Sequence, residues 1–298
     1  MRVMLIGAEG QLGSDLRKVL QAETLIPLSH ADIEITDADA VRQAFERHRP
    51  DVVINTAAFH RVDDCETQME RAFQVNAFAV RGLAQECRRS GAVLVHFSTD
   101  YVFAGEKREP YVETDRPSPL SVYGASKLAG EYLVAAALER HFVIRTCGLY
   151  GLGGSRSKGG NFPETMLRLA AQAKPIRVVS DQVVTPTYTA DLARTVSQLI
   201  RTEAYGLYHI TSGGSCTWFE FAQRIFELAG VSADLTPVTA EAFGAPARRP
   251  AYSVLQNHRL EKLGLDDVPV WEDGLRRYFV ERKQTSGAVA SPTSSATV

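Results

Sequence analysis

The sequence predicts an α/β fold, in which a doubly wound parallel sheet is followed by a smaller α/β domain. Segments with strand and helix character alternate five times within residues 1–150. The strand-like segments are apolar throughout, which is typical of strands buried on both faces of a parallel sheet. Right-handed crossovers then place helices on both sides of the sheet.

The elements of the first half follow in order from their residue patterns. Residues 3–6 form a short apolar run that ends at Gly7. Residues 11–21 carry apolar side chains at helical spacing, and residues 37–48 begin with Asp37, a residue type that caps helices. The remaining predicted elements are strands at 24–28, 51–55, 92–98 and 142–145, and helices at 69–89 and 121–140.

The second half is less regular. Residues 151–160 contain five glycines and predict a flexible loop. Helices are predicted at 161–173, 189–201, 217–230 and 272–281, with a strand at 176–180. We therefore expect one domain over 1–150, a second over 151–282, and some elements of 176–201 returning to the first. Residues 283–298 are rich in Ser, Thr and Ala and predict a disordered tail.

Composition limits the classes of function. The 298 residues include 33 Lys and Arg against 35 Asp and Glu, a formal net charge of −2. This balance argues against a nucleic-acid-binding protein with a general basic surface. The four cysteines lack paired spacing, so we expect a reducing compartment and no metal site. No apolar run approaches the ~18 residues that a membrane helix needs, and a cytoplasmic protein without membrane partners is expected.

A glycine-rich turn follows the first strand. Gly7, Gly10 and Gly13 occur there, with Gln11 and Leu12 between the last two. Glycines at these places permit a tight turn, close approach of the backbone to a pyrophosphate, and close helix–strand packing. The helix amino terminus adds free N–H groups and a partial positive charge. The position of this turn predicts a dinucleotide-binding site of the Rossmann type.

The end of the second strand bears on which dinucleotide is bound. An acid at the strand end would bind the free ribose hydroxyls and select NAD. Ser29 and His30 stand there and tolerate a phosphate, so NADP is favoured, with some use of NAD also expected. No arginine adjoins them. Asp32 as the ribose-binding acid is the competing interpretation.

Small residues follow the third strand. Ala57 and Ala58, followed by Phe59, let a cofactor lie against the backbone at the carboxyl end of that strand. The same residues would equally suit ordinary helix–sheet packing.

Three residues predict the chemistry. Tyr123 and Lys127 are four residues apart on one predicted helix, so both side chains share a face. The ammonium of Lys127 is expected to lower the pKa of Tyr123 toward neutrality and to bind the nicotinamide ribose. Thr99, at the end of the fourth strand, can hydrogen-bond the same carbonyl oxygen. Tyr123 would then protonate the alkoxide that forms when hydride arrives from NAD(P)H.

These motifs resemble a known group of enzymes. The segments GAEGQLG (7–13), STDYVFAG (98–105) and YGASK (123–127) are similar to those of extended short-chain dehydrogenases/reductases. Within that superfamily, residues 160–170, 181–193, 206–214 and 246–250 resemble the dTDP-4-dehydrorhamnose reductase family. The resemblance covers residues 1–280.

The resemblance implies a reaction and a set of site residues. The reaction is reduction of the C4 keto group of a dTDP-linked 6-deoxyhexose by NADPH or NADH. Thr99, Tyr123 and Lys127 are the implied catalytic triad. The other implied residues are Glu34 and Ile35 beside the adenine, Asn76 bracing the active-site backbone, and Asp100, Tyr101, Asn161 and Arg249 on the substrate side. Arg248 is an equally suitable phosphate ligand, and a surface salt bridge is the other interpretation of Arg249.

Several alternatives stay open at this point. A sibling nucleotide-sugar 4-reductase or a 4-epimerase would use the same triad. A non-catalytic NADP-binding regulatory subunit similar to the β subunit of methionine adenosyltransferase is a third alternative, against which the intact triad argues. Gly148 stands where members of the family often carry a Trp, and this removes a stacking surface from the sugar pocket. The resemblance leaves a homodimer open.

Overall fold

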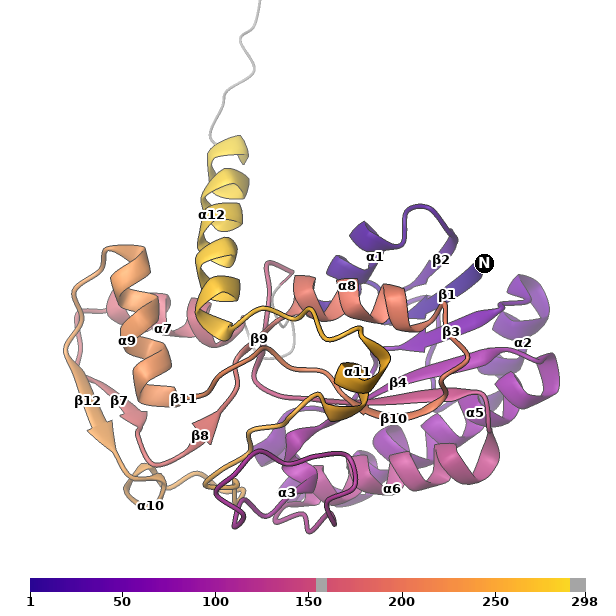
Figure 1. Ribbon diagram of the computed structural model, residues 1–298, viewed down its shortest axis with the longest axis horizontal. Coiled ribbons are helices and arrows are strands. Elements are labelled where there is room, and N and C mark those ends of the chain that lie inside the picture. Colours follow the sequence, from indigo (N-terminus) through magenta and orange to yellow (C-terminus); the bar gives the residue numbers. More distant parts are fainter. Residues whose placement is uncertain (154–159, 290–298) are drawn as a thin grey trace, which may run out of the picture.

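The first lobe is built on a six-stranded parallel sheet (Figure 1). The structure is a computed structural model that describes residues 1–153 and 160–289. The strand order is β10-β5-β4-β3-β1-β2, and every neighbouring pair is parallel. This confirms the predicted doubly wound fold. The strands are β1 (Arg2–Ile6), β2 (Thr24–Leu28), β3 (Val52–Asn55), β4 (Val93–Thr99), β5 (His141–Thr146) and β10 (Gly206–His209).

Two helical layers cover this sheet, because every central strand has apolar side chains on both faces. One core cluster joins side chains such as Leu5, Ile54 and Ile144 to α1 (Gln11–Val19), α8 (Thr189–Leu199) and α11 (His258–Leu263). The other joins Met4, Val53 and Val143 to the opposite layer. That layer consists of α2 (Ala38–His48), α5 (Ala79–Ser90) and α6 (Val122–Ala137).

The predicted helix at 69–89 is present but interrupted. It consists of α4 (Met69–Phe73), a π-helical turn (Gln74–Phe78) and α5, and it is preceded by a short helix, α3 (Val62–Thr67), which the sequence did not indicate. A π-turn inserts one extra residue per turn and often occurs at functional sites. Here it carries Asn76, which is fully buried.

A second lobe packs beside the first around an aromatic core. Tyr150, Tyr188, Phe221, Trp271 and Tyr278 form the largest part of that core. The lobe contains α7 (Phe162–Ala170), α9 (Trp218–Ala229), α10 (Ala240–Phe243) and α12 (Trp271–Val289). Its strands pair as β7 (Ile176–Val179) with β12 (Leu235–Val238), β8 (Val183–Val184) with β11 (Cys216–Thr217), and β6 (Leu149–Tyr150) with β9 (Thr187–Tyr188).

The chain crosses between the lobes more often than the sequence suggested. α8 packs against α1 in the first lobe, whereas β7 stays in the second lobe with β12. β10 was not predicted, because residues 206–209 are only four and Leu207 is the one aliphatic side chain among them. It completes the sheet beside β5. The two lobes are therefore not divided at residue 150, because α8 and β10 follow it in the chain and pack in the first lobe.

The predicted tail begins too early. α12 continues to Val289, past the expected start of disorder at 283. Elongating an existing helix adds one backbone hydrogen bond per residue, and residues 283–289 contain no proline to stop it. Residues 290–298, and residues 154–159 of the predicted glycine-rich loop, lie outside the described residues.

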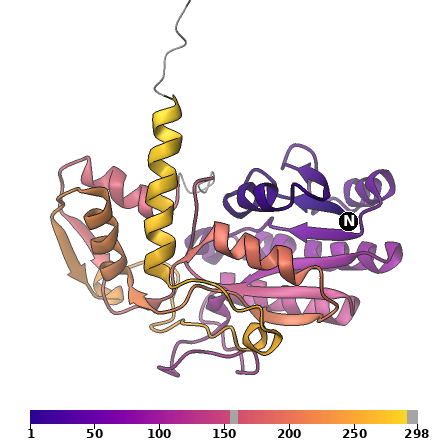
Figure 2. The ribbon, with the colours of Figure 1, turned by 45° about the horizontal axis from the view of Figure 1, so that its top comes forward.

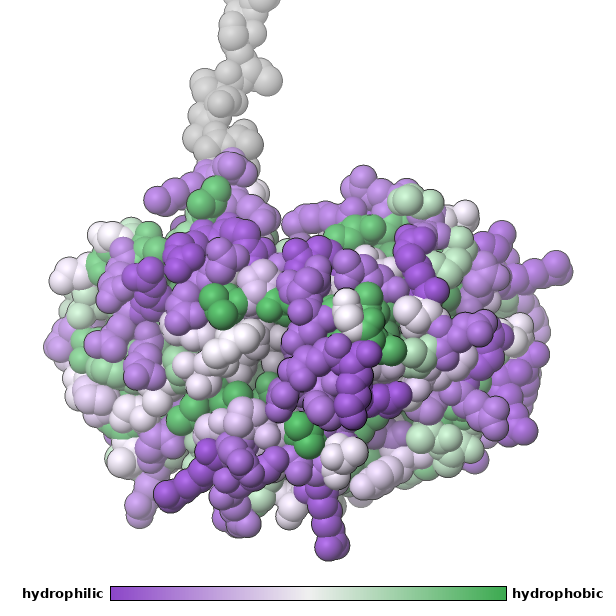
Figure 3. All heavy atoms as spheres, viewed as in Figure 1, coloured by the Kyte–Doolittle hydropathy of each residue, from purple (hydrophilic) through white to green (hydrophobic). Residues whose placement is uncertain are grey.

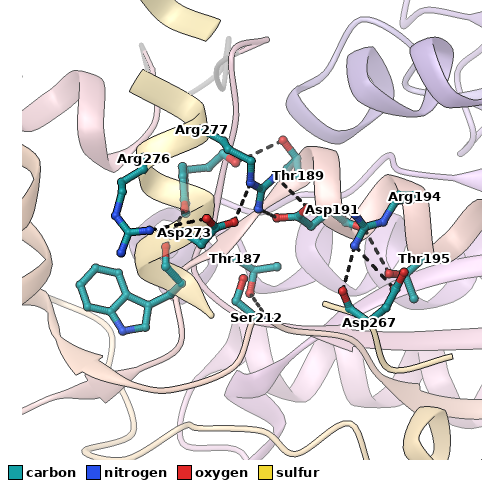
Figure 4. A network of polar contacts seen from close by, with 12 residues as sticks. Thr187, Thr189, Asp191, Arg194, Thr195, Ser212, Asp267, Asp273, Arg276 and Arg277 are labelled. Carbon is teal, nitrogen blue, oxygen red and sulfur yellow. Dashed lines mark hydrogen bonds and ion pairs between the residues drawn. The ribbon is translucent and has the colours of Figure 1, made fainter. Parts of the chain in front are cut away.

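An ion-pair network fixes α12 to the first lobe (Figure 4). Arg277 of α12 donates to both carboxylate oxygens of Asp191 on α8, at 2.9 and 2.6 Å, and to Asp273 at 2.7 Å. The Asp191 side chain is only 3% exposed. In both ribbon views α12 lies on the side of the second lobe that faces the first (Figures 1 and 2). The contact between Arg277 and Asp191 therefore holds the two lobes together.

The surface is mainly polar. On the face shown in Figure 3, hydrophobic residues form small separate groups among hydrophilic ones. Within the described part of the chain, no helix is both long and apolar enough to span a membrane.

Candidate active site

The glycine-rich turn closes tightly above β1. Gly7 has φ +79°, and its carbonyl accepts from Gly10 N at 2.9 Å. A Cβ on Gly13 would lie 2.2 Å from that same carbonyl oxygen. Gly10 precedes α1, and no side chain of a described residue caps this helix. The first N–H groups of α1 are therefore available to an anion, which is what a pyrophosphate requires.

Gly13→Ala is expected to disable this turn. The added methyl overlaps backbone, which cannot rotate away, so the turn must open and its N–H groups must move. We expect the dissociation constant for NADPH to rise at least about tenfold, the equivalent of about 1.4 kcal/mol. Titration of bound-cofactor fluorescence measures it. Gly82→Ala in α5 is the matched control, since its Cβ meets no atom of a described residue within 4 Å.

A pocket of about 170 Å³ adjoins the turn. It brings together residues that the sequence predicted separately. They are Gly7, Glu34, Ile35, Ala57, Ala58 and Phe59. Ser29 and His30 also line it, at the end of β2. Arg71 and Val75 complete the wall and were missed, because helical spacing alone does not tell which face of residues 69–89 meets a pocket.

The polar residues that follow β2 differ in their contacts, which bears on whether Asp32 or the pair Ser29 and His30 faces the ribose. The Asp32 carboxylate accepts from Ser29 Oγ at 2.7 Å and from Ser29 N at 2.8 Å, and these hydrogen bonds hold its pKa below the usual range. Asp32 is not among the described residues that line the pocket, whereas Ser29 and His30 are. The interpretation of Asp32 as the ribose-binding acid is therefore not supported.

Thr99, at the carboxyl end of β4, hydrogen-bonds Tyr123, whereas Lys127 lies one turn further along α6 with its Nζ beside His96. Tyr123 lies in the first turn of α6, which Ser121 caps by accepting from Gly124 N at 3.2 Å. A Cβ on Gly124 would lie 2.3 Å from the Tyr101 carbonyl, so glycine lets α6 approach the β4 end. The rings of Tyr101 and Tyr123 make an edge contact with centroids 6.0 Å apart.

The electrostatics of Tyr123 differ from the expectation. Burial and the nearby Asp100 carboxylate raise the pKa of the Tyr123 phenol above its usual range. Hydrogen bonding with Thr99 lowers this pKa, but by less. The predicted shift toward neutrality was wrong, because both groups are removed from water, which disfavours the phenolate and the ammonium alike. Tyr123 thus stays protonated at neutral pH, as a proton donor must.

Lys127 is enclosed beside a buried imidazole. Its Nζ lies 3.2 Å from His96 Nε2, and both residues are at most 2% exposed. Burial lowers the pKa of Lys127 to about 8, although the Glu131 carboxylate favours the charged form. Burial and Lys127 together hold the pKa of His96 well below its usual value, so His96 is neutral. The sequence suggested only a packing role for His96.

Asn76 connects the cofactor side to the triad helix. Its Oδ1 accepts from Phe59 N at 2.9 Å, and its Nδ2 donates to Phe59 O at 2.9 Å and to Ser126 Oγ at 3.0 Å. A Cβ on Gly130 of α6 would lie 2.2 Å from Asn76 O, so the two helices are in close contact. This geometry is that of a brace between the segment after β3 and α6.

Polar residues extend from the triad toward the second lobe. Asp100 is buried and accepts from Thr99 Oγ1 and from Cys147 Sγ, both at 3.0 Å. Burial raises the pKa of Asp100 despite these hydrogen bonds. Arg249 donates to Asp63 Oδ2 at 2.9 Å and hydrogen-bonds Tyr101. Arg249 is therefore paired with Asp63, and it lies beside Tyr101.

Asn161 does not join this group. It caps α7, with Oδ1 accepting from Glu164 N at 3.0 Å and Nδ2 donating to Gly151 O at 2.7 Å. Backbone groups thus bind the amide oxygen and one amide hydrogen of Asn161, and its contact with substrate stays a prediction. Within residues 1–153 and 160–289, no group of three or more His, Cys, Asp or Glu could hold a metal ion.

Known proteins resemble this chain over nearly its full length. The family model described as "RmlD substrate binding domain" matches residues 1–284. The spore coat polysaccharide biosynthesis protein SpsK of Bacillus subtilis is 42% identical, over 94% of this chain and 98% of its own. A probable dTDP-4,6-dihydroxy-2-methyloxan-3-one 4-ketoreductase of Streptomyces antibioticus is 41% identical, over 94% and 95%.

A solved structure agrees with the same family. The dTDP-4-dehydrorhamnose reductase of Bacillus anthracis, in complex with NADP, superposes with a TM-score of 0.90 at 41% identity. The alignment covers 94% of this chain and 99% of that one. The chain belongs to the dTDP-4-dehydrorhamnose reductase family of oxidoreductases.

Proposed function

We propose that this protein reduces the C4 keto group of dTDP-4-dehydro-L-rhamnose to give dTDP-L-rhamnose, with NADPH as the hydride donor and NADH as a second donor. One observation carries the proposal furthest. Tyr123 stays protonated at neutral pH, hydrogen-bonds Thr99 and lies one helical turn before the buried Lys127, in a fold that also carries a glycine turn and a pocket that suit a dinucleotide.

The residues present fit a nicotinamide dinucleotide. The tight Gly7–Gly13 contact leaves backbone N–H groups for the pyrophosphate, and the 170 Å³ pocket would hold the adenine. Glu34 and Ile35 would flank the adenine, and Ala57, Ala58 and Phe59 would face the cofactor. When bound, the nicotinamide supplies a hydride. The related enzyme from Bacillus anthracis is described with NADP.

The protein's own residues would then manage the proton. Tyr123 donates its phenolic proton to the C4 oxygen as that oxygen gains negative charge. Thr99 would donate its hydroxyl proton to the same oxygen, and to do so the hydroxyl must turn from Asp100 Oδ1, its acceptor at 3.0 Å. Lys127 offers ammonium donors to the ribose and stabilises the phenolate left after proton transfer. Arg249 and Tyr101 would bind the sugar-nucleotide side, with Arg248 as the alternative phosphate ligand.

The decisive assay follows loss of the nicotinamide absorbance with dTDP-4-dehydro-L-rhamnose and NADPH. Steady oxidation of NADPH that is stoichiometric with product is expected. Absence of turnover by the native protein, with the cofactor bound, would contradict the reductase assignment. Substrate isomerisation without net cofactor consumption would instead identify an epimerase.

A sibling 4-ketoreductase is the second candidate. The Streptomyces antibioticus relative, at 41% identity, is described as acting on a different dTDP-linked ketosugar. Gly148, where members of the family often carry a Trp, has φ +56°, and a Cβ there would lie 3.1 Å from Pro186 Cα, so this backbone favours glycine over a bulky side chain. A panel of dTDP-linked 4-ketosugars, compared by kcat/KM, separates the two candidates. The substrate with the highest kcat/KM identifies the enzyme.

The pH profile should report Lys127. Its ammonium form is lost as pH rises through about 8, whereas Tyr123 is still protonated there. We therefore expect kcat for reduction to fall on the alkaline side with an apparent pKa near 8. Stopped assays across a buffer series measure it. A rate that stays level up to about pH 10, the usual pKa of tyrosine, would contradict this role for Lys127.

A further inference from the structure

The outer wall of the adenine pocket carries one cation whose purpose the mechanism does not explain. Arg71 projects from α4 and lines the pocket together with Val75, one turn further along. Its guanidinium lies over the Phe59 ring, 5.0 Å from the ring centroid, and donates to Gln68 Oε1 at 3.3 Å. The side chain is thus exposed, and its contacts with Phe59 and Gln68 orient it on the pocket wall.

The rest of the pocket suits a flat, uncharged ring. Ile33, Ile35 and Val75 contribute apolar walls, and Ala57 adds backbone with little side chain. The volume of about 170 Å³ has room for a purine but not for the whole nucleotide. Guanidinium groups stack on aromatic faces because they are planar, delocalised and weakly hydrated.

The neighbouring charges favour stacking over phosphate binding. Hydrogen bonds from Thr36 lower the pKa of Glu34. The nearby His30 and Arg71 side chains lower it further. Glu34 is therefore an anion on the same pocket wall as Arg71. A phosphate placed against Arg71 would be repelled by Glu34, whereas a neutral purine would not. Ser29 and His30 lie at the β2 end, where the ribose 2′ position is expected.

We propose that Arg71 closes this pocket by stacking its guanidinium on the adenine of the dinucleotide, and that it does not bind the ribose 2′-phosphate. The inference rests on the proposed use of a nicotinamide dinucleotide. Arg71 would then contribute equally to the affinity for NADPH and to the affinity for NADH.

The test is the dissociation constants of NADPH and NADH, measured without sugar substrate by fluorescence of the bound nicotinamide. Arg71→Met should weaken both by the same factor, about 3- to 30-fold, the range of a stacked cation. Arg71→Lys should recover little of this loss, because an ammonium keeps the charge but not the plane. Arg42→Met is the matched control, since Arg42 is an exposed helical arginine that pairs with Asp39 at 2.7 Å.

Three results would overturn the inference. A loss confined to NADPH would make Arg71 a phosphate ligand. Unchanged affinity for both cofactors would remove it from the site, and full recovery by Arg71→Lys would reduce its role to charge. Failure of the native protein to bind either cofactor would instead refute the proposed cofactor use.

Discussion

Tyr123→Phe is expected to lower kcat by about 10²- to 10⁴-fold, the usual contribution of a general acid, while the dissociation constant for NADPH stays nearly unchanged. The variant removes one oxygen and leaves the ring that contacts Tyr101. Thr99 and Lys127 keep their other partners, Asp100 and His96. The loss should therefore appear in the chemical step, not in cofactor binding.

Tyr132→Phe is the matched control for this experiment. Tyr132 lies on the same helix, α6, and is 60% exposed, so the same atom is removed without touching the site. Its kcat should match that of the native protein. If Tyr123→Phe kept a rate within a few-fold of native, a different group would have to supply the proton, and Asp100, whose pKa burial raises, would be the next candidate.

Arg277→Leu is expected to destabilise the protein by about 3 kcal/mol, the lower end of the range for leaving a buried charge without its partner. Asp191 is 3% exposed, and the next guanidinium among the described residues, that of Arg194, has its Nη1 3.9 Å away. For a chain of this size we expect Tm to fall by roughly 6 °C, measured by differential scanning calorimetry. Cofactor affinity should change little, because the pocket belongs to the first lobe.

The adjacent arginine provides the control. Arg276 is 53% exposed and meets Asp273 only at 3.5 Å, so Arg276→Leu should shift the free energy of unfolding by less than about 0.5 kcal/mol. Figure 4 shows the two guanidinium groups pointing in different directions from α12. Equal Tm values for the two variants would refute the stabilising role of the Arg277–Asp191 pair.

The sheet could be predicted from the sequence because its signals are local. The five strands that residues 1–150 contribute to the large sheet are short apolar runs, and the helices between them have periodic apolar faces. A cap marks the start of α2, where Asp37 accepts from Asp39 N and Ala40 N. β10 had no such signal. A four-residue edge strand is defined by its partner, β5, which lies 60 residues earlier in the chain.

The candidate site likewise contains residues that local sequence signals predict and residues that they do not. Gly7, Gly13, Tyr123 and Lys127 could be found because turn geometry and helical spacing fix their chemistry locally. The partners that set their behaviour could not. His96 meets Lys127 across 31 residues, and Arg71 reaches the pocket from a helix broken by a π-turn. The direction of the Tyr123 pKa shift depends on burial, which no spacing reveals.

The sequence by itself thus determined the doubly wound sheet, the glycine turn and the tyrosine–lysine pair, because backbone propensity and side-chain periodicity act over a few residues. Only the tertiary structure decided that Asp32 accepts from Ser29 without lining the pocket beside the glycine turn, that Arg71 lines this pocket, that Asn161 caps a helix, and that α8 and β10 return to the first lobe. These outcomes depend on which residues, distant in the sequence, come into contact and are buried together. Burial and the loss of hydration that follows from it are properties of the folded chain.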